Sequence, residues 1–185
     1  MKRAFSITTC VGDRGTTRTL GGETLPKSAP RIEACGQVDE VVSALGLARA
    51  SAARGSALDA HLQELQRTLF TFAAELSAGV RLAASLPQRL DARAVRKLDA
   101  LRRRLEKTIE PMRDFILPGE NLSGAQLDYA RTVARRCERA VVTLADRGEF
   151  RNRYALVWLN RLSDVLWLLA RQAEGHSRPL HEGRP

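Results

Sequence analysis

Aromatic residues, cysteine and histidine are scarce in this 185-residue sequence. Phe, Trp and Tyr together make up 5% of it, and it holds three cysteines and three histidines. Cys10, Cys35 and Cys137 are odd in number and far apart, which argues against a disulfide framework and favours a reducing, cytoplasmic location. No histidine lies near a Cys or Glu at metal-ligand spacing, and no Ser/His/Asp or Cys/His arrangement is suggested. We therefore expect neither a protein-held metal nor a nucleophilic catalyst.

Long hydrophobic runs are also missing. No stretch of about 18 uncharged apolar residues occurs, which excludes a transmembrane helix. The N-terminus has a basic start but no apolar stretch long enough for a signal peptide. We expect a protein that does not bind membranes.

What the sequence does have is hydrophobic content and positive charge. Its 44% hydrophobic residues exclude a disordered chain, because burying them offsets the entropy lost on folding. Thirty Lys and Arg against twenty-one Asp and Glu give a formal net charge of +9. Such a charge suits nucleic acid, an anionic membrane surface or a phosphorylated small molecule as the partner.

The chain divides into a loop-rich start and a helical remainder. Residues 1–29 are rich in Gly, Thr, Ser and Pro, which predicts a flexible arm with a short strand at residues 4–9. From Pro30 onward, apolar residues recur at spacings of three and four, as in amphipathic helices. The expected helices span residues 30–53, 57–78, 91–109, 123–145 and 153–174. We expect an all-α, up-and-down five-helix bundle as one domain over residues 1–175, followed by a disordered tail at 176–185.

The arm contains a possible anion site. Gly12 and Gly15 allow the tight backbone turn that points N–H groups at an anion. Cations and hydroxyls that would add to such a site follow closely: Arg14, Thr16, Thr17, Arg18 and Lys27. The spacing is not that of a Walker loop, and by itself the pattern is more typical of a flexible arm.

Two helices carry polar residues that a plain bundle does not need. Arg131, Arg135 and Glu138 fall within one narrow arc, which suits binding of a phosphate or carboxylate or, alternatively, a solvated charged face. On the last helix a polar face lies next to a leucine stripe, so its residues must satisfy a neighbouring helix or line a site. Its members are Asn160, Asp164, Trp167 and Arg171. Asp39 and Glu40 raise the same question, because they interrupt an apolar segment of the first helix and need a cation nearby.

The third predicted helix is strongly basic. Its cations are Arg93, Arg96, Lys97, Arg102, Arg103, Arg104 and Lys107. They lack interleaved aromatic residues and any recognised nucleic-acid module, so we expect a solvated face or part of an oligomer rim, and no nucleic-acid partner.

Five segments in this order resemble the PduO-type ATP:cob(I)alamin adenosyltransferases. They are TCVGDRGTT at 9–17, PRIEACGQVDE at 30–40, FILPG at 115–119, ARTVARRCER at 130–139 and LNRLSD at 159–164. The resemblance covers residues 7–173. It implies a trimer of five-helix bundles with active sites between adjacent subunits.

The resemblance also implies a reaction. Cobalt(I) of a reduced corrinoid attacks the 5′ carbon of ATP, giving adenosylcobalamin and releasing the triphosphate, to which Mg²⁺ binds. The implied protein partners are a cobalamin reductase and an adenosylcobalamin-dependent enzyme. Because cobalt supplies the electron pair, the protein mainly orients the reactants and stabilises the leaving triphosphate.

Each matched residue then has an implied role. The residues that would hold the phosphates are Thr9, Cys10, Val11, Gly12, Asp13, Gly15, Thr17, Arg18, Lys27, Arg135, Arg136 and Arg139. Those that would contact or orient the nucleotide are Glu138, Asn160 and Asp164. Asp39 and Arg131 match the family's intersubunit salt bridge, and Phe115 matches the aromatic residue that displaces the corrinoid's lower axial ligand. Of all these, the residues expected to serve catalysis are Arg135, Arg131, Asp39 and Phe115.

Three departures from the family pattern keep a second interpretation open. Cys10 stands where the family has a phosphate-binding lysine, and Glu120 stands where it commonly has glycine. Val41 and Val42 replace the Leu-Asn that follows Val-Asp-Glu in the family. The alternative is a catalytically weakened paralogue that serves as a carrier or sensor of corrinoid and ATP.

Overall fold

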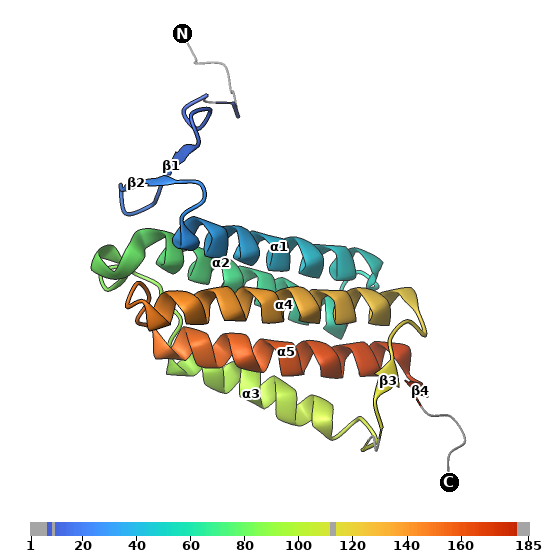
Figure 1. The fold of residues 1–185 in the computed structure, drawn as a ribbon. Helices are drawn as coiled ribbons and strands as arrows, with labels where there is room; N and C mark the ends of the chain where they lie inside the picture. Colours follow the sequence, from blue (N-terminus) through green and yellow to red (C-terminus); the bar gives the residue numbers. More distant parts are fainter. Residues whose placement is uncertain (1–6, 9, 112–113, 181–185) are drawn as a thin grey trace.

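The computed structural model describes residues 7–8, 10–111 and 114–180, and over these ranges the chain forms five long helices arranged up and down (Figure 1). The helices are α1 (Pro30–Ser51), α2 (Ala57–Ala83), α3 (Ala92–Glu106), α4 (Leu122–Asp146) and α5 (Arg153–Glu174). Helix α4 packs against α1 and α5, while α2 covers α1 and α3 covers α5. The predicted five-helix bundle is confirmed. None of the helices in the described ranges has the length and apolar character needed to span a bilayer.

Helix boundaries follow local chemistry. The side chains of Ser56, Asp91, Asn121 and Asn152 each accept a hydrogen bond from a backbone N–H in the first turn of the helix they precede. Such caps satisfy donors that the helix leaves unpaired. The expected N-cap at Asp91 is therefore confirmed.

Two helix ends differ from those predicted from the sequence. Gly79, the expected end of the second helix, adopts φ 69° and ψ 170°, so the regular helix breaks there before a final turn that extends to Ala83. The third helix ends at Glu106, and its predicted extension to residue 109 is wrong. The backbone N–H and the hydroxyl of Thr108 both donate to the carbonyl oxygen of Leu105, at 2.9 and 2.8 Å, which tightens and closes the last turn.

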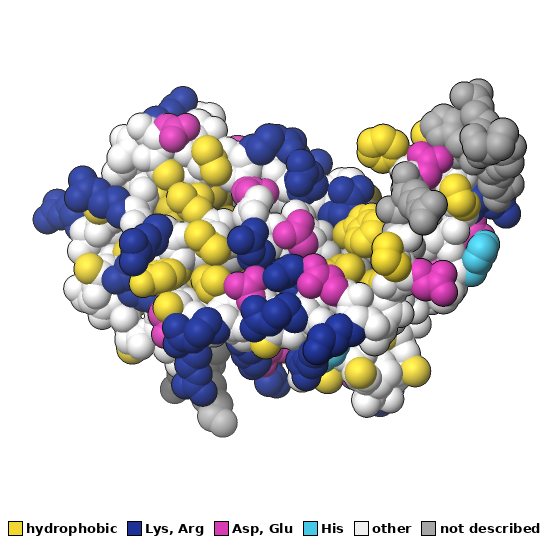
Figure 2. Space-filling view, turned by 90° about the horizontal axis from the view of Figure 1, so that it is seen from below, with side chains coloured by type: hydrophobic (Ala, Val, Ile, Leu, Met, Phe, Trp, Pro, Cys, Tyr) yellow, Lys and Arg dark blue, Asp and Glu magenta, His cyan; other side chains and the backbone are white. Residues whose placement is uncertain are grey.

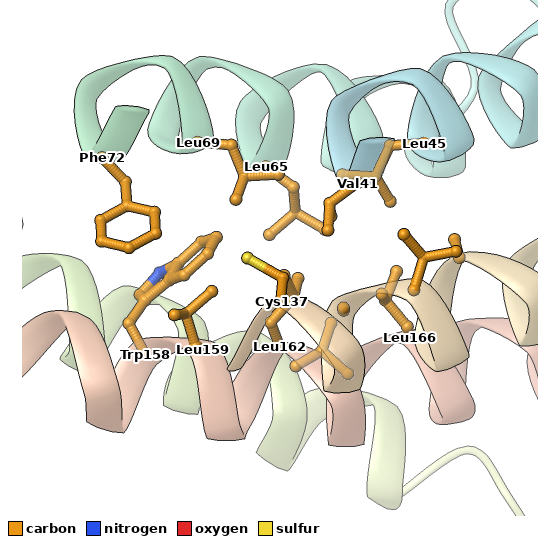
Figure 3. Close-up of a cluster of buried hydrophobic side chains, with 14 of the residues drawn as sticks. Val41, Leu45, Leu65, Leu69, Phe72, Cys137, Trp158, Leu159, Leu162 and Leu166 are labelled. Atoms are coloured by element: carbon orange, nitrogen blue, oxygen red, sulfur yellow. The ribbon is translucent and has the colours of Figure 1, made fainter. Parts of the chain in front are cut away.

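The core lies between the helix layers (Figure 3). Large side chains on α2 and α5 meet there, among them Phe72 and Trp158, and Cys137 of α4 lies between them and α1. Phe72 also contacts Phe150 edge-to-face, with ring centroids 5.8 Å apart. Burying such residues stabilises the fold by about 1.5–3 kcal/mol each, so the helices form a fixed scaffold for the polar residues on their outer faces.

The N-terminal arm is more ordered than the sequence suggests. Strands β1 (Thr16–Arg18) and β2 (Thr24–Pro26) pair as an antiparallel hairpin that lies beyond the start of α1 (Figure 1). The backbone N–H of Leu20 donates to Ser77 Oγ of α2 at 3.0 Å. Gly21 passes so close to α2 that an added Cβ would lie 2.5 Å from the carbonyl oxygen of Ala78. The strand expected at residues 4–9 falls largely outside the described residues, and Ile7 and Thr8 are not in a strand.

The C-terminal segment is also structured where a disordered tail was expected. Strand β4 (Arg178–Pro179) pairs antiparallel with β3 (Ile116–Leu117), the strand that follows Phe115. Gly175 has φ 69° and ends α5, so the chain can turn back toward this loop. The prediction of a disordered tail from residue 176 is therefore wrong for residues 178–179, because the loop backbone offers them hydrogen-bond partners.

Candidate active site

A shallow cavity on the outer side of α4 and α5 collects several of the predicted site residues. Its volume is about 340 Å³. Arg131 and Arg135 reach it from α4, and Asp164 reaches it from α5. Its remaining lining residues are Glu106, Ser163, Trp167 and Leu168. The two helices that sequence reasoning treated separately thus contribute to one site.

Arg135 is the least satisfied cation of this cavity. Its side chain is exposed and has no hydrogen-bond or ion-pair partner among the described residues. Asp164 is exposed in the same way. An unpaired guanidinium beside a second arginine suits recognition of a phosphate, since its planar donors match phosphate oxygens in pairs.

One turn along α4, Glu138 and Asn160 connect the two helices. Asn160 Nδ2 donates to Glu138 Oε1 at 3.0 Å, and Asn160 Oδ1 accepts from Arg161 Nη1 at the same distance. The amide therefore has a fixed orientation. This agrees with the expectation that the polar residues of α5 either satisfy a neighbouring helix or line a site.

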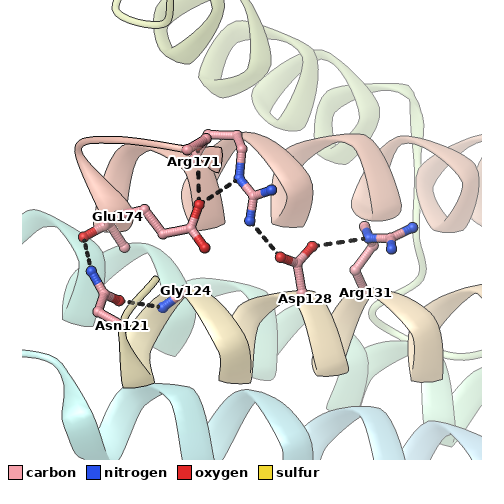
Figure 4. Close-up of polar contacts among 8 residues, drawn as sticks. Asn121, Gly124, Asp128, Arg131, Arg171 and Glu174 are labelled. Carbon is pink, nitrogen blue, oxygen red and sulfur yellow. Dashed lines mark hydrogen bonds and ion pairs between the residues drawn. The ribbon is translucent and has the colours of Figure 1, made fainter. Parts of the chain in front are cut away.

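Arg131 is held by a buried charge network that sequence reasoning missed (Figure 4). Arg131 Nε lies 3.3 Å from Asp128 Oδ1, and the other oxygen of Asp128 accepts a hydrogen bond from Arg171. Arg171 Nε is 3.0 Å from Glu174 Oε2. The side chains of Arg171 and Glu174 are 1% and 0% exposed. The spacing of three residues within each of the pairs 128–131 and 171–174 was the available signal.

The network also corrects the interpretation of the polar face on α5. Arg171 was grouped with Asn160 and Asp164, but it is buried and directed at α4, whereas the other two are exposed. The physical reason is its place near the end of the bundle, where the carboxylate of Asp128 faces it from α4. Within one chain, then, Arg171 serves the fold.

Residues 37–40 of α1 face α4 through Arg136. Arg136 Nε donates to Gln37 Oε1 at 2.8 Å, and the same guanidinium pairs with Glu40. Arg136 therefore lies against α1, not in the cavity. Asp39 is exposed and has no hydrogen-bond or ion-pair partner among the described residues, so its expected pairing with Arg131 does not occur within one chain. Arg139 is exposed, and its Nη1 donates to the backbone oxygen of Arg135 at 3.2 Å.

The arm residues form a group of their own. Lys27 lies over Gly12, since a Cβ added to Gly12 would lie 3.1 Å from Lys27 Nζ. The backbone N–H of Lys27 donates to the carbonyl oxygen of Gly15 at 2.8 Å. The other described members of the predicted phosphate-binding set, Cys10, Val11, Asp13, Thr17 and Arg18, lie in the same hairpin region. Thr9 lies outside the described residues.

This hairpin region and the α4–α5 cavity are separate in one chain. The arm extends beyond the N-terminal end of α1 (Figure 1), and none of its described residues lines the cavity. Cys10 has φ 57°, a left-handed conformation that a non-glycine residue adopts at some cost.

Phe115 presents its ring to solvent at the opposite end of the bundle. The side chain is 80% exposed. Its backbone is held on both sides: the N–H donates to Asp114 Oδ1 and the carbonyl oxygen accepts from the N–H of Leu180, each at 2.7 Å. Glu120 follows three residues after the end of β3, and its Oε1 lies 3.4 Å from Arg178 Nε.

The thiols of the half-buried Cys35 and the buried Cys137 have no catalytic character. Burial, and to a smaller degree the charge of Asp39, raises the pKa of Cys35 to about 11. Burial raises the pKa of Cys137 to about 12. Both remain protonated at neutral pH and are therefore poor nucleophiles and metal ligands. The described residues contain no group of three or more His, Cys, Asp or Glu able to hold a metal ion.

Comparison with known proteins assigns a chemistry to these features. A family model described as cobalamin adenosyltransferase matches residues 7–173. A corrinoid adenosyltransferase of Citrobacter freundii is 38% identical over 174 residues, which cover 92% of this chain and 96% of that protein. The corrinoid adenosyltransferase PduO of Salmonella typhimurium is 37% identical over 167 residues, which cover 90% of this chain and 49% of that longer protein.

A solved structure agrees over nearly the whole chain. It is a variant of the PduO-type ATP:corrinoid adenosyltransferase from Lactobacillus reuteri, complexed with cobalamin and ATP. It matches with a TM-score of 0.87 at 30% sequence identity, covering 96% of this chain and 100% of that one.

Proposed function

The chain belongs to the cobalamin adenosyltransferase family and is an ATP:corrinoid adenosyltransferase, and from this premise we propose how its residues divide the work. The reaction joins the 5′ carbon of ATP to cobalt(I) and releases triphosphate. The electron pair of the new bond comes from cobalt, and the bond that breaks joins the same carbon to the triphosphate oxygen. The protein therefore needs to align carbon with cobalt and to neutralise the departing anion.

Arg135 and Arg131 bind the triphosphate. The observation that carries this assignment is the unpaired guanidinium of Arg135 in the α4–α5 cavity. Arg131 lines the same cavity and is oriented by Asp128. An arginine oriented before the reaction, as Arg131 is by Asp128, stabilises charge on the leaving group without having to reorganise. Arg139, one turn beyond Arg135, adds positive charge to this side of α4.

Glu138, Asn160 and Asp164 hold the nucleoside. The hydrogen bond between Asn160 and Glu138 fixes both polar groups relative to the two arginines. Ribose hydroxyls and adenine nitrogens need both donors and acceptors, and an amide beside two carboxylates provides them. Arg136 supports this assembly indirectly, because its contacts with Gln37 and Glu40 fix α4 against α1.

The active site is completed by a second copy of the chain in a trimer. Among the described residues of the arm, which include Gly12, Arg18 and Lys27, none lines the cavity of its own subunit, so the arm can cover the nucleotide of a neighbour. Asp39 pairs with the neighbour's Arg131 across the same boundary. Support for this comes from Asp39, which is exposed without a partner among the described residues of its own chain.

Mg²⁺ enters with ATP as part of the substrate. The described residues offer no carboxylate cluster for a resident ion. Phosphate oxygens and water supply most of the ligands, as is usual for Mg²⁺ bound to nucleotides.

Phe115 contacts the corrinoid. Its exposed ring, on a loop whose backbone is held on both sides, is suited to displace the lower axial ligand of cobalt. A cytoplasmic location, a cobalamin reductase that supplies the reduced corrinoid and an adenosylcobalamin-dependent enzyme that accepts the product complete the proposal.

The test is a spectroscopic assay with cob(I)alamin, ATP, Mg²⁺ and a strong reductant. The unmodified protein should convert the cob(I)alamin spectrum to that of adenosylcobalamin. Arg135→Ala should lower kcat by about 10²–10³ with the oligomer unchanged, whereas Arg93→Ala, at an exposed position of α3, should behave as the unmodified protein. Near-normal turnover in Arg135→Ala would contradict the phosphate assignment. Tight ATP and corrinoid binding without a cobalt–carbon bond would instead favour the carrier or sensor.

A further inference from the structure

The C-terminal segment is attached to the loop that carries Phe115. Leu180 donates its backbone N–H to the carbonyl oxygen of Phe115 at 2.7 Å. Pro179 and Arg178 stand opposite Ile116 and Leu117 in the β3–β4 pair. The backbone of Phe115, the residue with the exposed aromatic ring, takes part in these contacts directly.

A charge pair joins the same two segments. Arg178 Nε lies 3.4 Å from Glu120 Oε1, and the two side chains are 55% and 24% exposed. An ion pair this open to water adds little stability by itself. It does connect β4 to the residue three positions beyond β3, so its main effect is on where the loop lies.

The segment is in turn anchored in the bundle core. It leaves α5 at Gly175, and Ser177 Oγ bonds to Glu174 Oε2 at 3.1 Å. Glu174 itself is fully buried beside Arg171. The buried charge network therefore restrains the start of residues 175–180, and these residues in turn restrain the backbone of Phe115.

Packing of the loop's side chains against the ends of α3 and α5 does not fix the loop in place of these contacts. A cavity of about 610 Å³ lies between the loop, the end of α3 and the end of α5. It is lined on the loop side by Asp114 and Ile116 and on the tail side by His176, Ser177 and Pro179. Because this space separates the loop from the helices, backbone hydrogen bonds and the ion pair determine the loop's position.

We propose that residues 175–180 act as a positioning strap for Phe115, with the Leu180 N–H and the Glu120–Arg178 pair as its two attachment points. The inference rests on the proposed corrinoid contact of Phe115. An aromatic ring that must displace an axial ligand works best when its backbone is fixed beforehand, since ordering a free loop opposes binding. Glu120 thus has a partner supplied by the tail of the same chain.

The first test removes one backbone donor. Leu180→Pro eliminates the N–H that bonds to Phe115, whereas Leu180→Ala retains the donor and serves as the matched control. Leu180→Pro should raise KM for cob(I)alamin roughly three- to tenfold relative to Leu180→Ala. It should also lower the fraction of five-coordinate cob(II)alamin seen spectroscopically with ATP present. The KM for ATP and Tm should match those of the control.

The second test reverses the charges. Arg178→Glu places two carboxylates together and should produce the same spectroscopic loss. The double variant Glu120→Arg/Arg178→Glu restores opposite charges and should recover most of the five-coordinate fraction. Rescue of this kind is not expected from general destabilisation of the tail.

Phe115→Ala, tested in the same experiments, distinguishes a failure of the strap from a failure of the proposed corrinoid contact. If Phe115→Ala leaves the cob(II)alamin spectrum unchanged, the corrinoid contact of Phe115 is wrong. If Phe115→Ala abolishes the five-coordinate signal but Leu180→Pro behaves as Leu180→Ala, the strap is overturned and the corrinoid contact stands. A rise in the KM for ATP equal to that for cob(I)alamin would also overturn the strap.

Discussion

Asn160 on α5 donates a 3.0 Å hydrogen bond to Glu138 on α4, and these two residues, from two different sequence motifs, are 22 positions apart in the chain. Neither residue is buried, so the core does not require the contact. A polar bond on the outer face of two packed helices, one turn from the unpaired Arg135, supports the role in nucleotide binding that we propose for both residues.

Breaking this bond should weaken ATP binding. Asn160→Ala and Glu138→Ala are each expected to raise KM for ATP by about tenfold, which corresponds to one hydrogen bond of about 1–1.5 kcal/mol. The double variant should lose less than the product of the two effects, because the residues act as a unit. Steady-state kinetics with saturating cob(I)alamin would measure this. Strictly multiplicative losses would show that the two side chains bind ATP independently.

Restoring a cation in the arm should strengthen ATP binding. Cys10 is exposed, and the sequence resemblance aligns it with a lysine of the family motif. Cys10→Lys is expected to lower KM for ATP several-fold by adding a charge-assisted contact to phosphate. Cys10→Met, which has comparable length and no charge, is the control. An unchanged KM in Cys10→Lys would mean that Arg14 or Arg18 already supplies the charge.

Removing the buried cation should destabilise the fold. In Arg171→Met, the carboxylates of Asp128 and Glu174 lose a buried partner, and we expect a loss of about 3–5 kcal/mol. For a chain of this size that loss lowers Tm by about 10 °C or more. Thermal unfolding followed by circular dichroism measures it, with Arg93→Met as the exposed control. Adding Asp128→Asn to Arg171→Met should recover part of the loss, since one unpaired charge is removed.

Cys10 and Cys137 should differ in their reactivity toward a thiol reagent. At pH 8 a thiol reagent should modify the exposed Cys10 rapidly and leave Cys137 unmodified until the protein unfolds.

Stability should also decline in alkali because of Cys35. Burial raises the pKa of Cys35 from 9.0 to about 11, so between these values the unfolded chain releases a proton that the folded chain retains. Stability is therefore complete below pH 9 and falls as pH rises toward 11. Urea unfolding of the unmodified protein and of Cys35→Ala at pH 8, 9 and 10 would measure this. The decline should be smaller in Cys35→Ala, and parallel declines would exclude the assignment.

Local signals in the sequence account for much of the fold. Pro30, the N-cap Asp91 and the helix break at Gly79 act over a few residues, so they could be identified without any long-range information. The two short strand pairs could not. Strands of two or three residues have no hydrophobic alternation to detect, and their pairing depends on which backbone groups the fold leaves nearby.

The candidate site likewise has a part that local sequence signals predict and a part that they do not. The arc of Arg131, Arg135 and Glu138 follows from helical periodicity, which fixes the directions of side chains on one helix before anything else packs against it. The sequence by itself therefore determined the helices, their polar faces and, through ordered motifs, the family and its chemistry. Tertiary structure alone decided that Arg171 is buried against Asp128 and that Leu180 holds Phe115. Both depend on contacts between distant segments, whose geometry exists only after the helices have packed.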